Sequence, residues 1–84
     1  TLFPAYPNPF NPETTISYQL PQNDEVSVII YDMMGREVTE LVNGHQVSGY
    51  HQIQWNAKNI SSGIYFVKMI AGNNISNQKI ILLK

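Results

Sequence analysis

The sequence predicts an all-β protein, a small antiparallel β-sandwich of six or seven strands. Short segments with alternating apolar and polar residues recur at about ten-residue spacing, with turn signals between them. No segment shows a sustained helical period with capping residues. Short strands at this spacing are typical of sandwiches.

The chain opens with a Pro-rich leader over residues 1–13, which includes either a first edge strand or the end of a linker. Its prolines fix φ near about −65° and favour extended backbone at the residues before them. Pro4 disfavours a central strand at the start of the chain. The remainder, residues 14–84, is predicted to form one β-sandwich domain.

The first strand with strict alternation covers residues 14–20, where Ile16, Tyr18 and Leu20 share one face. The second covers residues 25–31 and carries apolar residues on both faces. This pattern indicates a strand that is covered on both sides or lies centrally in its sheet.

A turn that contains Gly35, where a positive φ is expected, leads to a third strand over residues 37–42. Val38 and Leu41 break the alternation of this strand, which predicts a bulge or an irregular strand. Asn43-Gly44 is the strongest short turn signal in the chain and is predicted to end the strand.

Residues 49–56 alternate strictly, and we place Ile53 and Trp55 of this strand in the core. Trp55 is then the largest buried group. His51 is expected at the margin of the core, and His45 in a polar loop.

The longest strand covers residues 63–71, and the last covers roughly residues 75–83. In the longest strand Lys68 occupies one face. The opposite set, Tyr65, Val67 and Met69, is therefore predicted to face the core.

Composition limits the function. The chain has 84 residues, a net charge of −1 and only 13% charged residues, so it presents no basic surface for nucleic acid or an anionic membrane. It has no signal peptide and no apolar run near the ~18 residues needed for membrane insertion. The absence of cysteine excludes disulfides, thiolate metal ligands and cysteine nucleophiles.

Catalytic and metal-binding residue types are present without a supporting pattern. Ser48, His45 or His51, and Asp32 supply the members of a hydrolytic triad, but no G-x-S-x-G motif surrounds any serine. Asp24 and Asp32 are oxygen donors that are not clustered in the sequence, which allows at most an incidental calcium ion. We therefore expect no enzyme activity, no dedicated metal site and no cofactor.

The C-terminal run of residues 79–84 places four apolar residues in succession between Lys79 and Lys84. Such a run is either a central strand covered on both faces or an edge strand offered to a receptor by strand addition. In the second case the two lysines limit self-association.

Four blocks carry a resemblance to a known family: YPNPFNPETT at 6–15, IIYDMMGREV at 29–38, SSGIYFVKM at 61–69 and KIILLK at 79–84. In this order and spacing, the chain resembles the C-terminal sorting domain of proteins exported by the type IX secretion system of Gram-negative bacteria. The Ig-like domain of flagellar hook-capping proteins has a related pattern. The resemblance implies an Ig-like sandwich.

The resemblance also implies a function. Such domains are non-catalytic modules that direct an N-terminally fused cargo protein across the outer membrane. The type IX machinery recognises them at the periplasmic side, so the cargo passes through the periplasm before it reaches the cell surface or the medium. A sortase-like component then removes the domain and anchors the cargo, or the cargo is released. A sorting signal ends its parent chain, so a natural terminus at Lys84 would favour sorting over the other classes of function.

The residues singled out in this way fall into two sets. Recognition by the translocon is expected at Gly35, Arg36, Lys79, Ile80, Ile81, Leu82, Leu83 and Lys84. Roles in the fold are expected for Pro7, Asn8, Pro9, Asn11, Trp55, Gly63 and Tyr65. The sequence departs from the commonest family pattern at Met33-Met34 and at Asn56-Ala57, where Asp-Gly is frequent.

Two alternatives belong to other classes of function. One is a structural assembly domain of the hook-capping type, which forms contacts between protomers. The other is a carbohydrate-binding accessory module, which needs exposed aromatic side chains as a sugar platform. Tyr50 and Phe66 are the two aromatic residues expected to face outward, and a neighbouring pair would support sugar binding.

Overall fold

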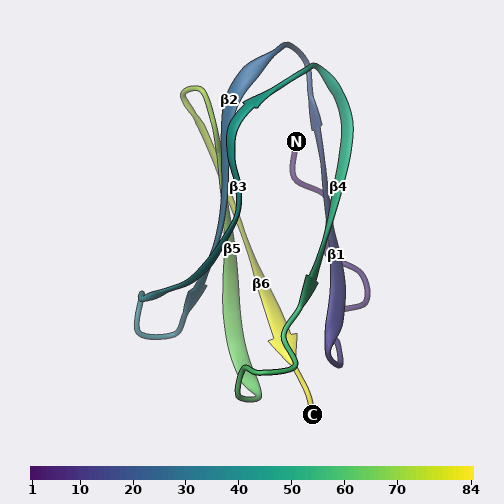
Figure 1. Cartoon of the computed structure of the whole chain (residues 1–84), viewed down its shortest axis with the longest axis vertical. Coiled ribbons are helices and arrows are strands. Elements are labelled where there is room, and N and C mark those ends of the chain that lie inside the picture. Colours follow the sequence, from purple (N-terminus) through teal and green to yellow (C-terminus); the bar gives the residue numbers. More distant parts are fainter.

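The computed structural model describes residues 1–84 and contains six β-strands and no helix (Figure 1). The strands are β1 (Glu13–Leu20), β2 (Asp24–Asp32), β3 (Glu37–Gln46), β4 (Gly49–Asn56), β5 (Gly63–Ala71) and β6 (Asn74–Leu82). One sheet pairs β1 with β4, and the other has four strands in the order β3-β2-β5-β6. Every pairing is antiparallel, which confirms the predicted sandwich.

The connectivity is that of an Ig-like sandwich. The chain changes sheet between β1 and β2, between β3 and β4, and again between β4 and β5. As a result β1 pairs with β4 and β2 pairs with β5, the crossed order of immunoglobulin-type domains. β2 is a central strand of its sheet, which is one of the two positions predicted for a strand with apolar residues on both faces.

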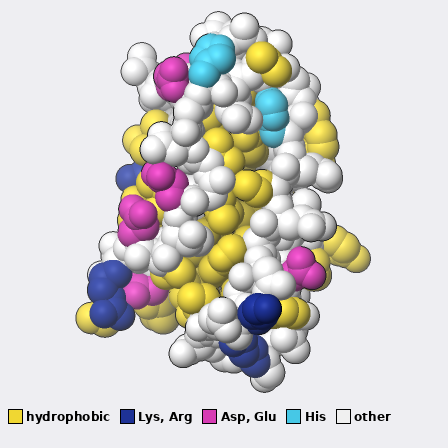
Figure 2. Space-filling view, viewed as in Figure 1, with side chains coloured by type: hydrophobic (Ala, Val, Ile, Leu, Met, Phe, Trp, Pro, Cys, Tyr) yellow, Lys and Arg dark blue, Asp and Glu magenta, His cyan; other side chains and the backbone are white.

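The sheets differ in width, so one side of the sandwich stays open between β3 and β4. Figure 2 shows hydrophobic side chains as a stripe along this side. We call it the open stripe and define it by the half-buried apolar residues of β3, β4 and the loop after β4, which pack against the core: Val38, Leu41, Val42, Ile53 and Ile60.

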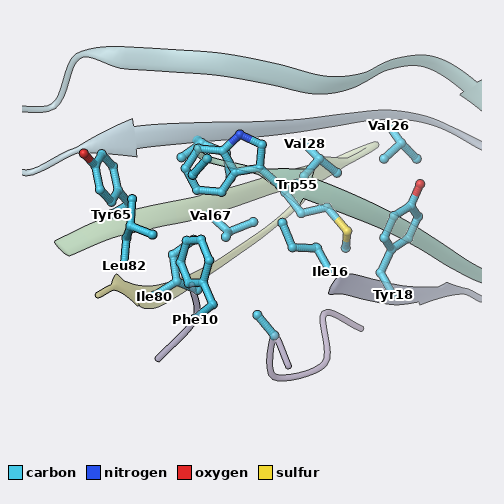
Figure 3. Close-up of a cluster of buried hydrophobic side chains, with 14 of the residues drawn as sticks. Phe10, Ile16, Tyr18, Val26, Val28, Trp55, Tyr65, Val67, Ile80 and Leu82 are labelled. Carbon is cyan, nitrogen blue, oxygen red and sulfur yellow. The ribbon is translucent and has the colours of Figure 1, made fainter. Parts of the chain in front are cut away.

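The core consists of 16 buried apolar side chains from both sheets and the leader (Figure 3). Trp55 lies at its centre, with ring centroids 5.6 Å from Phe10 and 5.9 Å from Tyr65. Tyr18 crosses from one sheet to the other, because its hydroxyl donates to Oε1 of Gln46 on β3 at 3.1 Å. Burial raises the pKa of Tyr18. No buried side-chain polar atom lacks a partner.

The alternation in the sequence predicted most inward faces correctly. Ile16, Tyr18 and Leu20 of β1 are buried, as are Tyr65, Val67 and Met69 of β5 and Trp55 of β4. Ile53 packs against the core but is only half-buried, since β4 forms the edge of the smaller sheet.

The predicted turn at Asn43-Gly44 is wrong. β3 continues through both residues, which pair with Ser27 and Val26 of β2, and the chain turns after Gln46 instead. β2 begins at Asp24 and therefore offers partners to the extended part of β3, so tertiary pairing overrides the local turn preference. His45 consequently lies in a strand and not in a loop.

The irregularity predicted in this strand is confirmed. The register against β2 shifts between Val28 and Ile29 and again between Ile30 and Tyr31. Each shift skips one residue of β3, and the skipped residues are Leu41 and Val38. These bulges turn both side chains toward the open stripe region without breaking the hairpin.

The leader lies along the edges of both sheets. Residues 1–6 run antiparallel to β1, with backbone hydrogen bonds from Phe3 N to Ser17 O at 3.0 Å and from Thr15 N to Tyr6 O at 2.9 Å. The chain then bends and crosses to the other sheet, where Phe10 bridges Leu82 of β6 in parallel orientation.

Phe10 anchors this crossing. Its side chain is 2% exposed and contacts Trp55 in the core. Its backbone N–H donates to Ile81 O at 2.9 Å, and its carbonyl accepts from Leu83 N at 3.0 Å. Thr14 supports the crossing from β1, because its buried hydroxyl donates to Pro7 O at 2.9 Å. The leader thus supplies both core volume and edge pairing.

Replacing Phe10 by Ala should lower the free energy of unfolding by about 3–5 kcal/mol, because it removes a buried ring and leaves a cavity beside Trp55. Tyr6→Ala is the matched control within the leader, since the Tyr6 side chain is 79% exposed. It should change the stability by less than about 0.5 kcal/mol. Urea unfolding followed by tryptophan fluorescence measures both variants. Equal losses would contradict the anchoring role of Phe10.

Candidate recognition site

The C-terminal segment alternates between the core and solvent. Ile80 and Leu82 are fully buried, and Ile81 is half-buried on the outer face of the four-stranded sheet. Lys79 and Lys84 are exposed, and Leu83 is 55% exposed. In the folded domain a partner can therefore contact only some of the residues predicted for recognition.

The edge of β6 is covered by the leader. The Asn8 side chain donates to Lys79 O at 3.1 Å and accepts from Ile81 N at 3.0 Å, and Phe10 continues the pairing. The alternative of a central strand is therefore wrong, because β6 ends its sheet. Strand addition is blocked over this part of the edge, since its backbone groups already have partners.

Gln78 completes the attachment of the leader. Its side chain donates to Phe3 O at 2.7 Å and accepts from Ala5 N at 2.8 Å. Sequence reasoning missed this residue. The available signal was a polar side chain at an inward position of β6, two residues before the buried Ile80.

The terminal Lys84 lies against the loop between β4 and β5. Its backbone N–H donates to Ser62 Oγ at 3.1 Å, and its ammonium donates to Lys58 O at 2.6 Å. Lys58, Lys84 and Arg36 are all exposed. In Figure 2 cationic side chains appear in two separate places in the lower part of the molecule, the part that holds the C-terminus and the β2–β3 turn in Figure 1. We call this region, defined by these three residues, the cationic end.

The turn from Asp32 to Arg36 is organised by one carboxylate. Asp32 Oδ1 accepts from the backbone N–H groups of Met34 and Arg36, each at 2.9 Å, and Oδ2 pairs with Arg36 Nε at 3.0 Å. Gly35 has a φ of +80°, which confirms the expected positive φ. Asp32 and Gly35 therefore fix the turn, and Met33, Met34 and Arg36 are exposed on it.

Hydrogen bonds to its charged form hold the pKa of Asp32 below its ordinary value. The backbone N–H of Arg36 makes the largest contribution, and burial acts in the opposite direction. An Asp three residues before a turn glycine is the sequence signal for this arrangement, because Asp side chains accept from nearby backbone donors.

Two of the residues expected to determine the fold flank the start of β5. The Tyr65 hydroxyl donates to Ser61 O at 2.6 Å, four residues upstream, and its ring packs edge-on against Trp55. A tyrosine that bonds back to the preceding corner is a feature of Ig-like domains. Gly63 opens β5 and pairs with Leu82.

The residue types of a hydrolytic or metal site do not come together. Asp32 and Asp24 lie at opposite ends of β2, and Ser48 lies at the β3–β4 connection, away from the turn that holds Asp32. The His51 ring contacts Val47 O at 2.7 Å and stacks on Tyr18. No group of three or more His, Asp or Glu side chains forms a metal-binding cluster.

One cleft has a volume of about 750 Å³ and lies between the start of the leader, the end of β1 and the β5–β6 turn. Asp24 is its only ionisable side chain, among neutral residues that include Phe3, Gln22 and Ile75. This lining offers no pair of groups for acid–base or nucleophilic chemistry.

Tyr50 and Phe66 face outward as predicted, with 57% and 37% exposure. Tyr50 lies on β4 and Phe66 on β5, so they belong to different sheets. They therefore do not form a neighbouring pair with each other.

The fold and the exposed residues describe a small Ig-like module whose surfaces, and not a cleft, are available for contacts. The chain belongs to the family described as Secretion system C-terminal sorting domain, whose model matches residues 4–83. This is a non-catalytic family of type IX secretion signals that direct the secretion of attached cargo across the outer membrane of Gram-negative bacteria. The match favours sorting over the assembly and sugar-binding alternatives.

The chain is also similar to a solved structure of PorZ, described as an essential bacterial surface component of the type-IX secretion system of Porphyromonas gingivalis. The TM-score is 0.69 and the identity 22%, and the match covers 99% of this chain and 11% of PorZ. At this identity the likeness shows the fold, and the chain spans about a tenth of that protein. None of the curated proteins matches the sequence. The chain contains no helix with the length and apolarity needed to span a membrane.

Asp32→Asn should lower the melting temperature near neutral pH and flatten its acid dependence. The folded-state pKa of Asp32 is depressed, so its contribution to stability is fully present above the unfolded-state value of about 3.9. It is lost as the pH falls through the lower folded-state value. Thermal melts between neutral and strongly acidic pH measure this effect.

Arg36→Gln is the comparison variant, because it keeps the backbone N–H that contributes most to the pKa shift of Asp32. It should alter the acid dependence less than Asp32→Asn does. The same acid dependence in Asp32→Asn as in the parent chain would contradict the role of this carboxylate.

Proposed function

We propose that the type IX machinery recognises the folded domain at its cationic end, together with the exposed part of the C-terminal segment. The observation that carries this proposal is that the chain terminus contacts the β4–β5 loop at the end of the sandwich where the β2–β3 turn also lies. The β2–β3 turn supplies Arg36, the β4–β5 loop supplies Lys58, and the chain terminus supplies Leu83 and Lys84.

The fixed positions of the Arg36 and Lys84 side chains support recognition at the cationic end. Arg36 is held by the Asp32 pair, and Lys84 is held by hydrogen bonds to Ser62 and to Lys58. The Asp32 carboxylate offsets the charge of Arg36, so Lys58 and Lys84 supply the net positive charge at this end. A partner does not need to order a flexible tail there, which reduces the entropic cost of binding. The partner surface that fits is acidic, with an apolar contact for Leu83.

Within this proposal the sequence-matched residues have separate tasks. Gly35, Ile80 and Leu82 keep the turn and the last strand in place, since one has a positive φ and two are fully buried. Arg36, Leu83 and Lys84 are the residues that touch the partner. Lys79 and Ile81 lie on the neighbouring sheet face and contact a partner only if it extends onto that face.

The route proposed for the cargo runs through the periplasm to the cell surface or the medium. A sortase-like component then removes the domain and anchors the cargo. Residues 1–10 are hydrogen-bonded to both sheets, so a cut inside this segment would have to detach it from the sandwich. We therefore expect the cut on the N-terminal side of the packed leader.

A reporter fusion tests sorting directly. Residues 1–84 are joined to the C-terminus of a reporter with a signal peptide and expressed in a bacterium with a type IX system. The reporter should reach the cell surface or the medium, and it should stay in the periplasm when the secretion machinery is disrupted. A reporter retained in the periplasm of the competent host would overturn the proposal.

Removing residues 79–84 from the fusion should leave the reporter in the periplasm, but it also removes the buried Ile80 and Leu82. A sharper variant combines Leu83→Ser with Lys84→Glu, which changes only exposed side chains. It should reduce export by about tenfold or more, because each lost contact with a partner costs on the order of 1 kcal/mol.

The matched control combines Gln19→Glu with Gln54→Glu, which produces the same change of net charge on the outer face of the other sheet. It should be exported like the parent, and melting curves verify that all variants fold. Equal export of the Leu83→Ser/Lys84→Glu variant and the control would contradict recognition at this end.

A further inference from the structure

The outer face of the four-stranded sheet is apolar and uncovered. Nothing packs on this side of β2, β5 and β6 (Figure 1). Seven apolar side chains point outward from these strands: Ile29, Tyr31, Ile64, Phe66, Ile70, Ile75 and Ile81. All are half-buried or exposed. Apolar side chains that gather on an uncovered sheet face mark an interaction surface.

Acidic and basic side chains lie at opposite edges of this face. The register places Glu37, Tyr31, Phe66 and Lys79 side by side in one row across β3, β2, β5 and β6. The carboxylate of Glu37 therefore lies at one edge of the row and the ammonium of Lys79 at the other, with two aromatic rings between them. All four side chains share the outward face, since directly paired residues of antiparallel strands point to the same side.

The next row repeats this polarity. It runs from Glu40 on β3 through Ile29 to Lys68 on β5 and Asn77 on β6. The Lys68 ammonium lies 6.0 Å from the centroid of the Tyr31 ring, so it stays on the face and does not extend away from it. Acidic groups thus occupy the β3 side and basic groups the β5–β6 side.

We propose that this face binds the same face of a second copy of the domain. A twofold axis parallel to the strands and between β2 and β5 exchanges β3 with β6 and β2 with β5. It brings Glu37 against Lys79 of the second copy, and Tyr31 against Phe66 of the second copy. Because the contact is isologous, each pair occurs twice.

In this dimer the acidic side chains of each copy lie opposite basic side chains of the other, and the apolar side chains of both faces are covered. Lys68 approaches Glu40 of the second copy, which lies one strand away from the position directly opposite it. A twofold axis perpendicular to the strands would instead place β3 against β3 of the second copy, with Glu37 and Glu40 facing the same acidic residues. The repulsion between these carboxylates favours the axis parallel to the strands. Two sheets packed in this way interleave their side chains as aligned sandwiches do.

The size of the face sets the strength of the dimer. Four strands spaced by about 4.8 Å, over about seven residues of 3.3 Å rise, give roughly 450 Å² on each copy. Stable interfaces bury about 800 Å² on each partner. The dimer is therefore weak, and it forms when copies are concentrated and dissociates on dilution.

Zero-length cross-linking of the purified 84-residue chain tests the geometry without any mutation. A carbodiimide joins a carboxylate directly to an amine, and Glu37 should join Lys79 of the second copy. In one chain these residues are three strand spacings apart, roughly 14 Å, with two aromatic side chains between them. Mass spectrometry of an equal mixture of isotope-labelled and unlabelled chain identifies the intermolecular product.

Charge reversal then tests the pairing. Glu37→Lys and Lys79→Glu should each raise the dimer dissociation constant by about tenfold, because symmetry converts two attractive contacts into two repulsive ones. The double variant restores opposite charges and should recover most of the parent affinity. Sedimentation over a dilution series measures the constants, and melting curves verify folding.

Glu13→Lys is the matched control, since Glu13 is exposed on β1 of the other sheet and the change reverses the same kind of charge. It should leave the dissociation constant within about twofold of the parent value. A chain that stays monomeric at every concentration would overturn the proposal and leave the face to the cargo or to an export component. An equal effect of Glu13→Lys, or no recovery in the double variant, would overturn it as well. Because these are measurements on the isolated chain, they do not depend on the outcome of the export assay.

Discussion

The structure depends on the crossing of the leader from β1 to β6. Without it β1 would lose the backbone partners on its outer edge, β6 would expose its edge, and the aromatic cluster around Trp55 would lose Phe10. The crossing is held by backbone pairing at both ends and by the side chains of Asn8, Thr14 and Gln78. A domain of 84 residues has a thin core, so one buried ring and one covered edge are large contributions.

The same crossing determines how the terminal segment can act. Residues 79–82 pair with β5 on one side, and the backbone of residues 79–83 bonds to Asn8 and Phe10 on the other. Their backbone is therefore closed to strand addition, and only side chains are available. A motif that reads as one continuous signal in the sequence thus separates into buried residues that maintain the last strand and exposed residues that a partner can touch.

Sequence reasoning located the strands because their core-facing residues alternate, and it placed Trp55, Tyr65 and Val67 correctly for that reason. It also found the bulges at Val38 and Leu41, since a bulge interrupts the same alternation. It failed at Asn43-Gly44, where the turn preference is local but the length of β2 decides the pairing. A one-dimensional pattern carries no information about the length of a partner strand.

The prediction of the candidate site was also limited by contacts that a local sequence pattern does not reveal. The sequence indicated Gly35 and Arg36 as a turn, but it did not show that Asp32 holds that turn together through two backbone donors and one ion pair. It indicated an apolar terminal strand, but not that a proline-rich segment some 70 residues away would cover its edge. Such contacts join residues that are distant in the chain, and only the fold brings them together.

The unequal widths of the two sheets explain why the domain acts through surfaces. A sheet of four strands cannot be fully covered by β1, β4 and a short leader segment, so β3 extends beyond its cover and the open stripe results. The outer face of the wide sheet stays apolar because β2 and β5 carry β-branched and aromatic residues on both sides. Two apolar surfaces and one cationic end therefore lie on different parts of a rigid module. Contacts at one of them leave the others free, so the proposed recognition at the cationic end and the proposed pairing of the broad face do not exclude each other.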